Sequence, residues 1–285
     1  MNEFLGLLFA PLSYPFMVRG LVAALIVGIV CAVLGTYVVL RGMAFLGDAL
    51  AHAILPGLAI GYLVEGGARP SLFWWALGTG VLTSLGIGAI TSRGQVKEDT
   101  AIGVVFAGMF ALGIALISTV RSYSVDLAHF LFGNVLGVAP QDLALISIFG
   151  GGVLLLVALF YKEFMVISFD PLLAATLRMP TKFLHYLLML MLAATIVISL
   201  QTVGVALMMA MLVTPAATAF MLTRRLFPMM VVSASIGAFS AVSGLYLSYY
   251  VNVASGAAIV LICTFIFGIV FGIKTLKGSA QVKLH

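Results

Sequence analysis

Residues 15–40 read PFMVRGLVAALIVGIVCAVLGTYVVL, and no charged residue follows Arg19 within this run. About 20 consecutive apolar residues are enough for an α-helix to cross the hydrocarbon core of a bilayer. The run does not alternate apolar and polar residues, which is the pattern of a strand in an outer-membrane β-barrel. It therefore predicts a transmembrane helix.

Eight further apolar runs follow this one. They cover residues 44–64, 71–92, 100–120, 141–160, 183–201, 204–222, 229–251 and 256–273. The runs at 183–201 and 204–222 are almost continuous, so the sequence predicts either eight or nine spans. We expect an all-α fold, a polytopic transmembrane helical bundle, with residues 1–285 forming a single membrane domain.

The composition excludes a soluble globular protein. Of the 285 residues, 63% are hydrophobic and 8% are charged, and the mean hydropathy is +1.25. A soluble globule needs more polar surface than this chain supplies. The net charge of +5 comes from scattered basic residues, which argues against a nucleic-acid partner and favours loop charges that set the topology in a lipid bilayer. Cys31 and Cys263 lie inside apolar runs, so we interpret them as packing residues.

The basic residues divide unevenly between the two sides of the predicted membrane. If nine spans alternate, eleven of the 14 lie on the side that contains Arg41 and the C-terminal tail. The other side receives Arg19, Arg69 and Arg121. Because basic residues accumulate on the cytoplasmic side, we expect a protein of the cytoplasmic (inner) membrane with its N-terminus outside and its C-terminus in the cytoplasm.

Asp48 and His52 lie well inside the second run, one helical turn apart, so both side chains share one face of the helix. At 1.5 Å per residue from Arg41, they lie about 10 Å and about 16 Å into the membrane. A charged group costs about 2.5 kcal/mol or more there, so such residues face a pathway or a protein interior. Carboxylate and imidazole ligands suit Mn²⁺, Fe²⁺ and Zn²⁺. We predict a metal site; hydrogen bonding of the pair to neighbouring helices is the alternative.

One carboxylate and one imidazole are too few to close a coordination shell. A twofold homodimer would double these ligands around its axis. Pro56 has no N–H, so it removes the helical partner of the His52 carbonyl. We therefore expect a kink there, and an unbonded backbone oxygen beside the imidazole.

Other polar positions in the runs are weaker candidates. Thr214-Pro215 predicts a second kink, which frees the carbonyl of Met211. This kink serves either packing or a gate. His129 and His185 lie at the ends of apolar runs, where we expect them at the membrane interface, and we assign neither of them to a metal.

Residues 168–180 predict a short cytoplasmic coupling helix between the fifth and sixth spans. Asp170 is a good N-cap, Pro171 fits the first turn, and Pro180 ends the helix. Its apolar side chains would be exposed outside the membrane, which favours docking into a groove on a soluble partner; lying on lipid is the alternative. These side chains are Leu172, Leu173 and Leu177. The chain has no Gly-x-x-x-x-Gly-Lys-Ser/Thr loop, so another polypeptide must bind any ATP that drives transport.

Several motifs, in the same order, resemble those of the permease subunits of metal-ion ABC importers for manganese, zinc and iron. They are GDALAHAILPG at 47–57, EDTAIG at 98–103, the stretch 106–113, LFGN at 131–134, FDP at 169–171, QTVG at 201–204 and LVTPAAT at 212–218. The resemblance covers nearly the whole chain, and the stretch 102–110 is closer to the manganese-type branch than to the zinc-type branch. The chain departs from the family at Leu172, where an acidic residue is common, and at Arg178, where glycine is common.

The resemblance implies a homodimer of permeases, two copies of a cytoplasmic ATP-binding subunit, and an extracellular or periplasmic metal-binding receptor. It implies that Asp48 and His52 are the intramembrane metal residues. It also implies that the coupling segment contacts the ATPase, through Phe169, Asp170, Pro171, Leu173 and Leu177.

We therefore expect a transport subunit, not an enzyme: the permease of an ATP-driven importer of divalent transition-metal ions, with Mn²⁺ favoured and Zn²⁺ or Fe²⁺ as alternatives. No tightly bound cofactor is expected, because the metal is cargo and ATP is bound by the partner. Two other classes stay open. A proton-coupled secondary metal carrier would use Asp48 and His52 as a proton relay, and a non-transporting membrane scaffold would use them as a packing pair.

Overall fold

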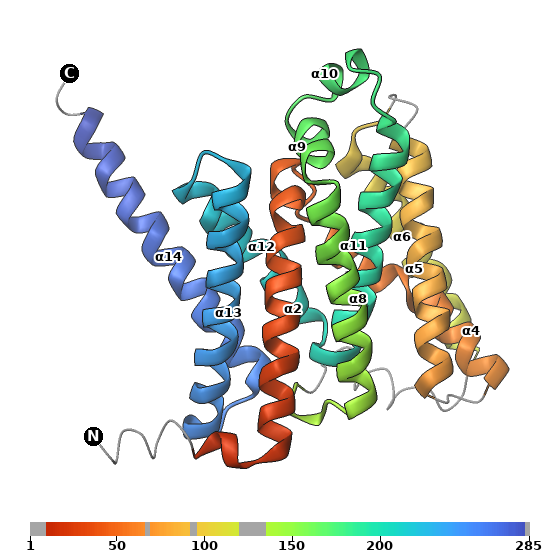
Figure 1. The fold of residues 1–285 in the computed structure, drawn as a ribbon. Coiled ribbons are helices and arrows are strands. Elements are labelled where there is room, and N and C mark those ends of the chain that lie inside the picture. The colour runs from red at the N-terminus through yellow and green to blue at the C-terminus, as the bar shows by residue number, and fades with distance from the viewer. Residues whose placement is uncertain (1–9, 66–68, 92–95, 120–134, 283–285) are drawn as a thin grey trace. The chain divides into compact units, whose positions relative to one another are not determined.

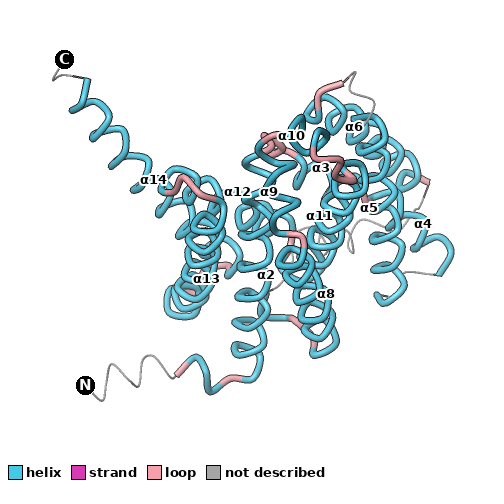
Figure 2. The backbone as a smooth tube through the Cα atoms, turned by 45° about the horizontal axis from the view of Figure 1, so that its top comes forward, coloured by secondary structure: helices cyan, strands magenta, loops and turns pink. Residues whose placement is uncertain are grey.

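A computed structural model describes residues 10–65, 69–91, 96–119 and 135–282. These residues form helices joined by turns, with no strand among them (Figure 2). Within these ranges, nine helical segments are long and apolar enough to cross a membrane. The all-α, polytopic fold is confirmed.

The choice between eight and nine spans depends on the almost continuous run at 183–222. Two helices occupy it, α11 (Thr181–Val203) and α12 (Val205–Leu222). They are separated at Gly204, whose φ of +83° is a backbone conformation that glycine adopts without a steric penalty. The described chain therefore has nine candidate spans.

The chain divides into two compact units. Unit 1 contains α2 (Pro15–Leu40), α12, α13 (Leu226–Val251) and α14 (Ser255–Val282), with two short 3₁₀ helices at Pro11–Ser13 and Val135–Gly137. Unit 2 contains α3 (Leu46–Ala53), α4 (Leu55–Glu65), α5 (Arg69–Thr91), α6 (Glu98–Ser118), most of α8 (Pro140–Leu159), α9 (Tyr161–Phe169), α10 (Pro171–Thr176) and α11. Figure 1 labels the main helices of both units.

Small residues let the helices of unit 1 pack closely. A Cβ added to Gly35 of α2 would lie 1.8 Å from the carbonyl oxygen of Leu212 in α12. The Ser233 hydroxyl of α13 donates a hydrogen bond of 2.8 Å to the carbonyl of Ala32 in α2. Small residues and hydrogen bonds between helices are both typical of helix contacts in membranes. Cys31 and Cys263 are buried, as expected of packing residues.

In unit 2, α3 and α4 together form one span, Leu46–Val64. The helix is interrupted at Ile54, between α3 and α4. α3 packs against α5, α6 and α11, and α4 packs against α5 and α6. The contact between α6 and α4 is tight, because a Cβ added to Gly113 would lie 2.7 Å from the Cβ of Leu55. Three longer helices therefore hold the broken span in place.

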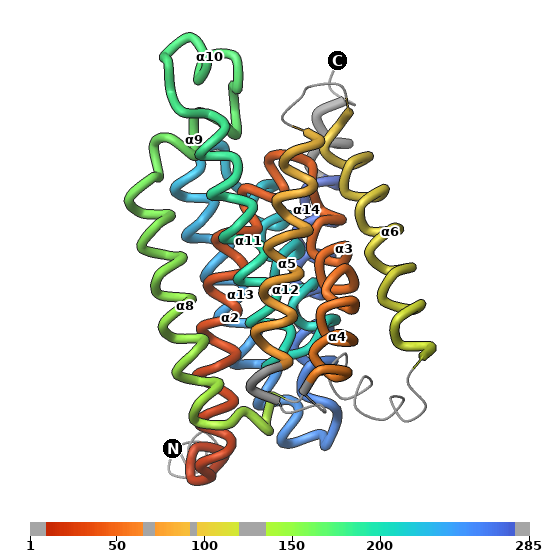
Figure 3. The backbone as a smooth tube through the Cα atoms, turned by 90° about the vertical axis from the view of Figure 1, so that its right-hand side faces the viewer, coloured from red at the N-terminus to blue at the C-terminus, as the bar shows by residue number. Residues whose placement is uncertain are grey.

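One end of unit 2 carries the short helices α9 and α10, which join α8 to α11. The beginnings of α6 and α11 lie at this same end (Figures 1 and 3). The beginning of α3 is tied to it as well, because Arg41 contacts Glu98 and His185 there. We refer to this end below as the α10 end.

Candidate metal site

The predicted metal residues lie on the one incompletely buried face of α3. Six of its eight residues are buried. The two exceptions are Asp48 and His52, whose side chains are 33% and 28% exposed. Nε2 of His52 lies 3.5 Å from Oδ1 of Asp48, so the two groups share one face, as their spacing predicts. The pair therefore opens outward from an apolar helix that is otherwise packed inside unit 2.

Aromatic rings of α6 border the imidazole of His52. The Phe110 ring lies edge to face with it, with centroids 5.6 Å apart, and the Phe106 ring lies 6.3 Å away. Phe106 also contacts Phe45, at the start of α3, at 5.6 Å. Such edge-to-face contacts favour one ring orientation. The sequence does not reveal that α6 supplies these rings, because the contact joins residues of two different spans.

The described part of the chain offers only two ligands at this position. Across residues 10–65, 69–91, 96–119 and 135–282, no three side chains of His, Cys, Asp or Glu gather where they could hold a metal ion. A site of one carboxylate and one imidazole leaves most of the shell of a transition-metal ion to other groups. Apart from the residues that the structure does not describe, such groups would come from water, backbone oxygens or another chain.

The backbone breaks just before Pro56. The helix is interrupted at Ile54, two residues before the proline, which cannot donate to the His52 carbonyl. The N–H of Ile54 points toward that oxygen, but a contact between residues two apart in helical backbone does not have hydrogen-bond geometry. The unbonded carbonyl of His52 stays a prediction, beside the carboxylate and the imidazole that α3 presents.

The second proline motif lies in unit 1. Pro215 is inside the continuous helix α12, and both Pro215 and Met211 are buried. The Thr218 hydroxyl donates a hydrogen bond of 2.7 Å to the carbonyl of Thr214. This side-chain bond is typical of helix backbone near a membrane proline. A gating role for Met211, Thr214 and Pro215 stays a prediction.

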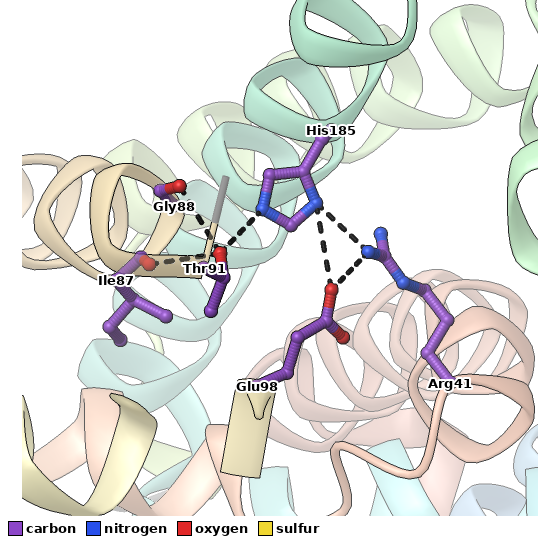
Figure 4. A network of polar contacts seen from close by, with 6 residues as sticks. All are labelled: Arg41, Ile87, Gly88, Thr91, Glu98 and His185. Atoms are coloured by element: carbon purple, nitrogen blue, oxygen red, sulfur yellow. Dashed lines mark hydrogen bonds and ion pairs between the residues drawn. The ribbon is translucent and has the colours of Figure 1, made fainter. Parts of the chain in front are cut away.

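A polar network lies at the α10 end of unit 2 (Figure 4). Its first member, Arg41, is seven residues before Asp48 in the sequence. Arg41 forms an ion pair with Glu98, the first residue of α6. The same guanidinium nitrogen lies 2.9 Å from Nδ1 of His185, in the first turns of α11. Nε2 of His185 lies 3.2 Å from the hydroxyl of Thr91, at the end of α5. The network therefore joins the turn before α3 to the end of α5 and to the beginnings of α6 and α11.

The hydrogen bonds define the tautomer of His185. The Thr91 hydroxyl donates to the carbonyls of Ile87 and Gly88, at 3.0 and 3.1 Å. Its lone pairs then accept the proton on Nε2, and Nδ1 accepts a hydrogen bond from Arg41. The structure adds that the side chain is only 13% exposed and that its two nitrogens contact Arg41 and Thr91. The position of His185 near the start of α11 fits a span edge, and its place at the membrane interface stays a prediction. His129 lies outside the described residues.

The predicted coupling segment forms α10, a helix of six residues. The Leu173 N–H donates a hydrogen bond of 2.9 Å to Oδ1 of Asp170, which is the N-cap, and Pro171 occupies the first turn. Ala174 is buried. The large apolar side chains are exposed: Phe169 57%, Leu172 80%, Leu173 47% and Leu177 56%.

The end of α10 shows how the chain accommodates Arg178 at a position where glycine is common in the family. Arg178 has a φ of +54°, in the left-handed region. Its N–H donates to the carbonyl of Ala175, and the Met179 N–H donates to that of Ala174, both at 3.1 Å. This pair of bonds is a Schellman motif, whose left-handed position glycine occupies at the lowest cost. Arginine keeps the motif at this position, so α10 ends as it would with glycine.

Comparisons with known proteins agree with this architecture. The model of the ABC 3 transport family matches residues 13–274. The chain is 50% identical over 267 residues to the manganese transport system membrane protein MntC of Listeria monocytogenes, covering 94% of each. It is 40% identical over 287 residues to the chelated iron transport system membrane protein YfeD of Yersinia pestis, covering 100% of this chain and 95% of that protein.

A solved structure has the same fold. The chain superposes on PsaBC from Streptococcus pneumoniae in complex with Fab with a TM-score of 0.79 and 40% identity, covering 94% of this chain and 95% of that chain. Fold, spans and sequence together define a membrane permease of the ABC transporter class. The chain belongs to the ABC 3 transport family, which confirms the resemblance to permeases of metal-ion importers.

Proposed function

We propose that this chain is the permease subunit of an ATP-driven importer of divalent transition-metal ions, with Mn²⁺ as the favoured cargo and Zn²⁺ or Fe²⁺ as alternatives. The names of the relatives support a transition metal, since they include a manganese and a chelated-iron transport protein. The higher identity belongs to the manganese protein, which favours Mn²⁺.

One observation carries the proposal. On an otherwise buried membrane helix, the only side chains with exposed surface are a carboxylate and an imidazole, 3.5 Å apart. Leaving such groups open inside a membrane is costly unless they serve a pathway. A transported ion has to be released as well as bound, so two protein ligands with the rest of the shell exchangeable suit transport better than a closed cage.

A second copy of the chain would complete the shell. A twofold axis beside α3 would bring two carboxylates and two imidazoles together from a homodimer. The exposed face of Asp48 and His52 is compatible with this arrangement, because the described residues of unit 2 do not cover it fully. Each copy would then supply half of a site that neither completes alone.

The energy would come from a partner. Two cytoplasmic ATP-binding subunits would dock on the exposed apolar side chains of α10, one on each copy. The excess of basic residues on the α10 side of the membrane supports placing that side, with the C-terminus, in the cytoplasm and the N-terminus outside. A receptor outside the membrane would deliver the ion to the opposite end.

The test is reconstitution of the permease in vesicles with its ATPase and its receptor, followed by uptake of Mn²⁺, Zn²⁺ and Fe²⁺. We expect ATP-dependent uptake, strongest for Mn²⁺, that is lost in Asp48→Ala and in His52→Ala. Asp99→Ala, which alters an exposed carboxylate, is the control and should transport normally. Normal uptake in both site variants would reject the site. Uptake by the chain without its ATPase, driven by a pH gradient, would indicate a proton-coupled carrier instead.

A further inference from the structure

The two helices that form the candidate metal site are joined at one end by a single cluster of charges. Arg41 is connected through the turn 42–45 to α3, which carries Asp48 and His52. Glu98 is the first residue of α6, which carries Phe106 and Phe110 against the His52 ring. The ion pair of Arg41 and Glu98 therefore fixes the distance between both sides of the site at their shared end.

The turn between Arg41 and α3 is itself ordered by hydrogen bonds. The Leu46 N–H donates to the carbonyl of Met43 at 2.9 Å, and the Ala49 N–H donates to that of Phe45 at 3.0 Å. Met43 is fully buried. Because this turn is short and held from within, a displacement of Arg41 is passed on to the first turn of α3, where Asp48 lies.

His185, the third residue of the cluster, connects it to α10. His185 is in the second turn of α11, which begins at Thr181. The turn that joins α10 to α11 is closed by the bond from Met179 N–H to Ala174 and by one of 2.8 Å from Thr181 N–H to the Met179 carbonyl. α10 also packs against α9 and α11, so it is held to unit 2 by contacts with both neighbouring helices.

We propose that Arg41, Glu98 and His185 are positioning residues of the transport cycle, which make the Asp48–His52 pair move together with α10. The inference rests on the proposed function. A push on α10 is passed through α11 to His185, from His185 to the Arg41–Glu98 pair, and from that pair to both α3 and α6. All of these elements belong to unit 2. The burial of Arg41 and His185, each 13% exposed, makes their contacts insensitive to salt and costly to break.

The test measures how many Mn²⁺ ions enter the vesicle for each ATP hydrolysed, in the reconstituted transporter with its ATPase and receptor. Glu98→Gln keeps the size of the side chain and removes the ion pair. We expect the ratio of Mn²⁺ imported to ATP hydrolysed to fall at least about tenfold, with ATP hydrolysis retained. Asp99→Asn is the matched control, because it alters the adjacent, exposed carboxylate; its ratio should equal that of the unmodified protein. His185→Gln provides a second route if the first variant does not assemble, and it should show the same loss of coupling.

A charge swap strengthens the test. Arg41→Glu combined with Glu98→Arg should recover part of the ratio that either single variant loses. A merely structural role predicts that uptake and ATP hydrolysis fall together with an unchanged ratio, and that result overturns the inference. If the unmodified protein shows no ATP-driven uptake of Mn²⁺, Zn²⁺ or Fe²⁺, the proposed function fails as well. If it transports, while Asp48→Ala does not and Glu98→Gln couples normally, only the positioning role is rejected.

Discussion

Asp48 and His52 illustrate what individual polar residues can reveal in a membrane protein. Each is costly in an apolar helix, so its presence has to be explained by what it contacts. The structure adds that both are partly exposed and that His52 is bordered by aromatic rings. Helix α3 therefore sets the position of the carboxylate, while rings of α6 favour one orientation of the imidazole.

Phe110 provides the first prediction at this scale. Phe110→Leu keeps an apolar side chain but removes the edge-to-face contact with His52, and such contacts contribute about 1 kcal/mol. We expect the purified permease to bind Mn²⁺ about fivefold more weakly, measured by electron paramagnetic resonance of the free ion. Phe265→Leu, on α14 where the ring is 69% exposed, should leave the affinity unchanged. Equal affinities for both variants would contradict the role of Phe110.

Arg178 provides a second prediction for a single residue. A non-glycine residue in the left-handed region costs about 1 kcal/mol, so Arg178→Gly should stabilise the end of α10 by about that amount. Hydrogen exchange of the α10 amides should slow by about fivefold in this variant. Lys182→Gly, which places glycine inside the first turn of α11, should have the opposite effect. Faster exchange in Arg178→Gly would show that the arginine side chain stabilises α10 through contacts of its own.

At the scale of elements, α10 is a short helix whose apolar side chains face away from the unit to which it belongs. Burial of one leucine in an interface contributes about 1.5–3 kcal/mol. Leu177→Ser should therefore weaken the binding of the ATPase to the permease in nanodiscs by at least about tenfold. Leu276→Ser alters a leucine of α14 that is 75% exposed, and it should bind the ATPase normally. Undiminished binding by Leu177→Ser would favour the alternative that α10 lies on lipid.

The contact between α2 and α12 depends on Gly35. Since an added Cβ would overlap the Leu212 carbonyl, Gly35→Ala must separate two helices, at a cost of about 1–3 kcal/mol. We expect a lower midpoint of thermal unfolding in detergent. Gly86→Ala is the control on α5, because the added Cβ meets no atom within 4 Å. A midpoint for Gly35→Ala as high as that of the control would show that the two helices can separate without loss of stability.

At the scale of the whole molecule, the spans were predictable because the bilayer imposes a length and a composition on each helix. The cap at Asp170 was predictable because capping depends on neighbouring residues alone. The network around His185 was not, since its partners Arg41 and Thr91 lie 144 and 94 residues away in the sequence. A signal was present, however: both Arg41 and Glu98 lie at predicted cytoplasmic ends of spans, where opposite charges can pair.

The same reasoning applies to the helix break beside His52. A proline removes one hydrogen-bond donor, and that much follows from the sequence. Where the backbone breaks in response depends on the packing of α4 against α5 and α6, which no local pattern specifies. The break falls at Ile54, between α3 and α4. Local rules identify the residue under strain, while the surrounding helices decide how the strain is relieved.

In the proposed homodimer, Asp48 and His52 from two copies hold one ion between them. Electron–nuclear double resonance of Mn²⁺ bound to the purified permease, labelled with ¹⁵N-histidine, measures this directly. We expect one Mn²⁺ per two chains, coupled to two equivalent histidine nitrogens, with both couplings lost in His52→Ala. One Mn²⁺ per chain, or nitrogen couplings that persist in His52→Ala, would contradict it.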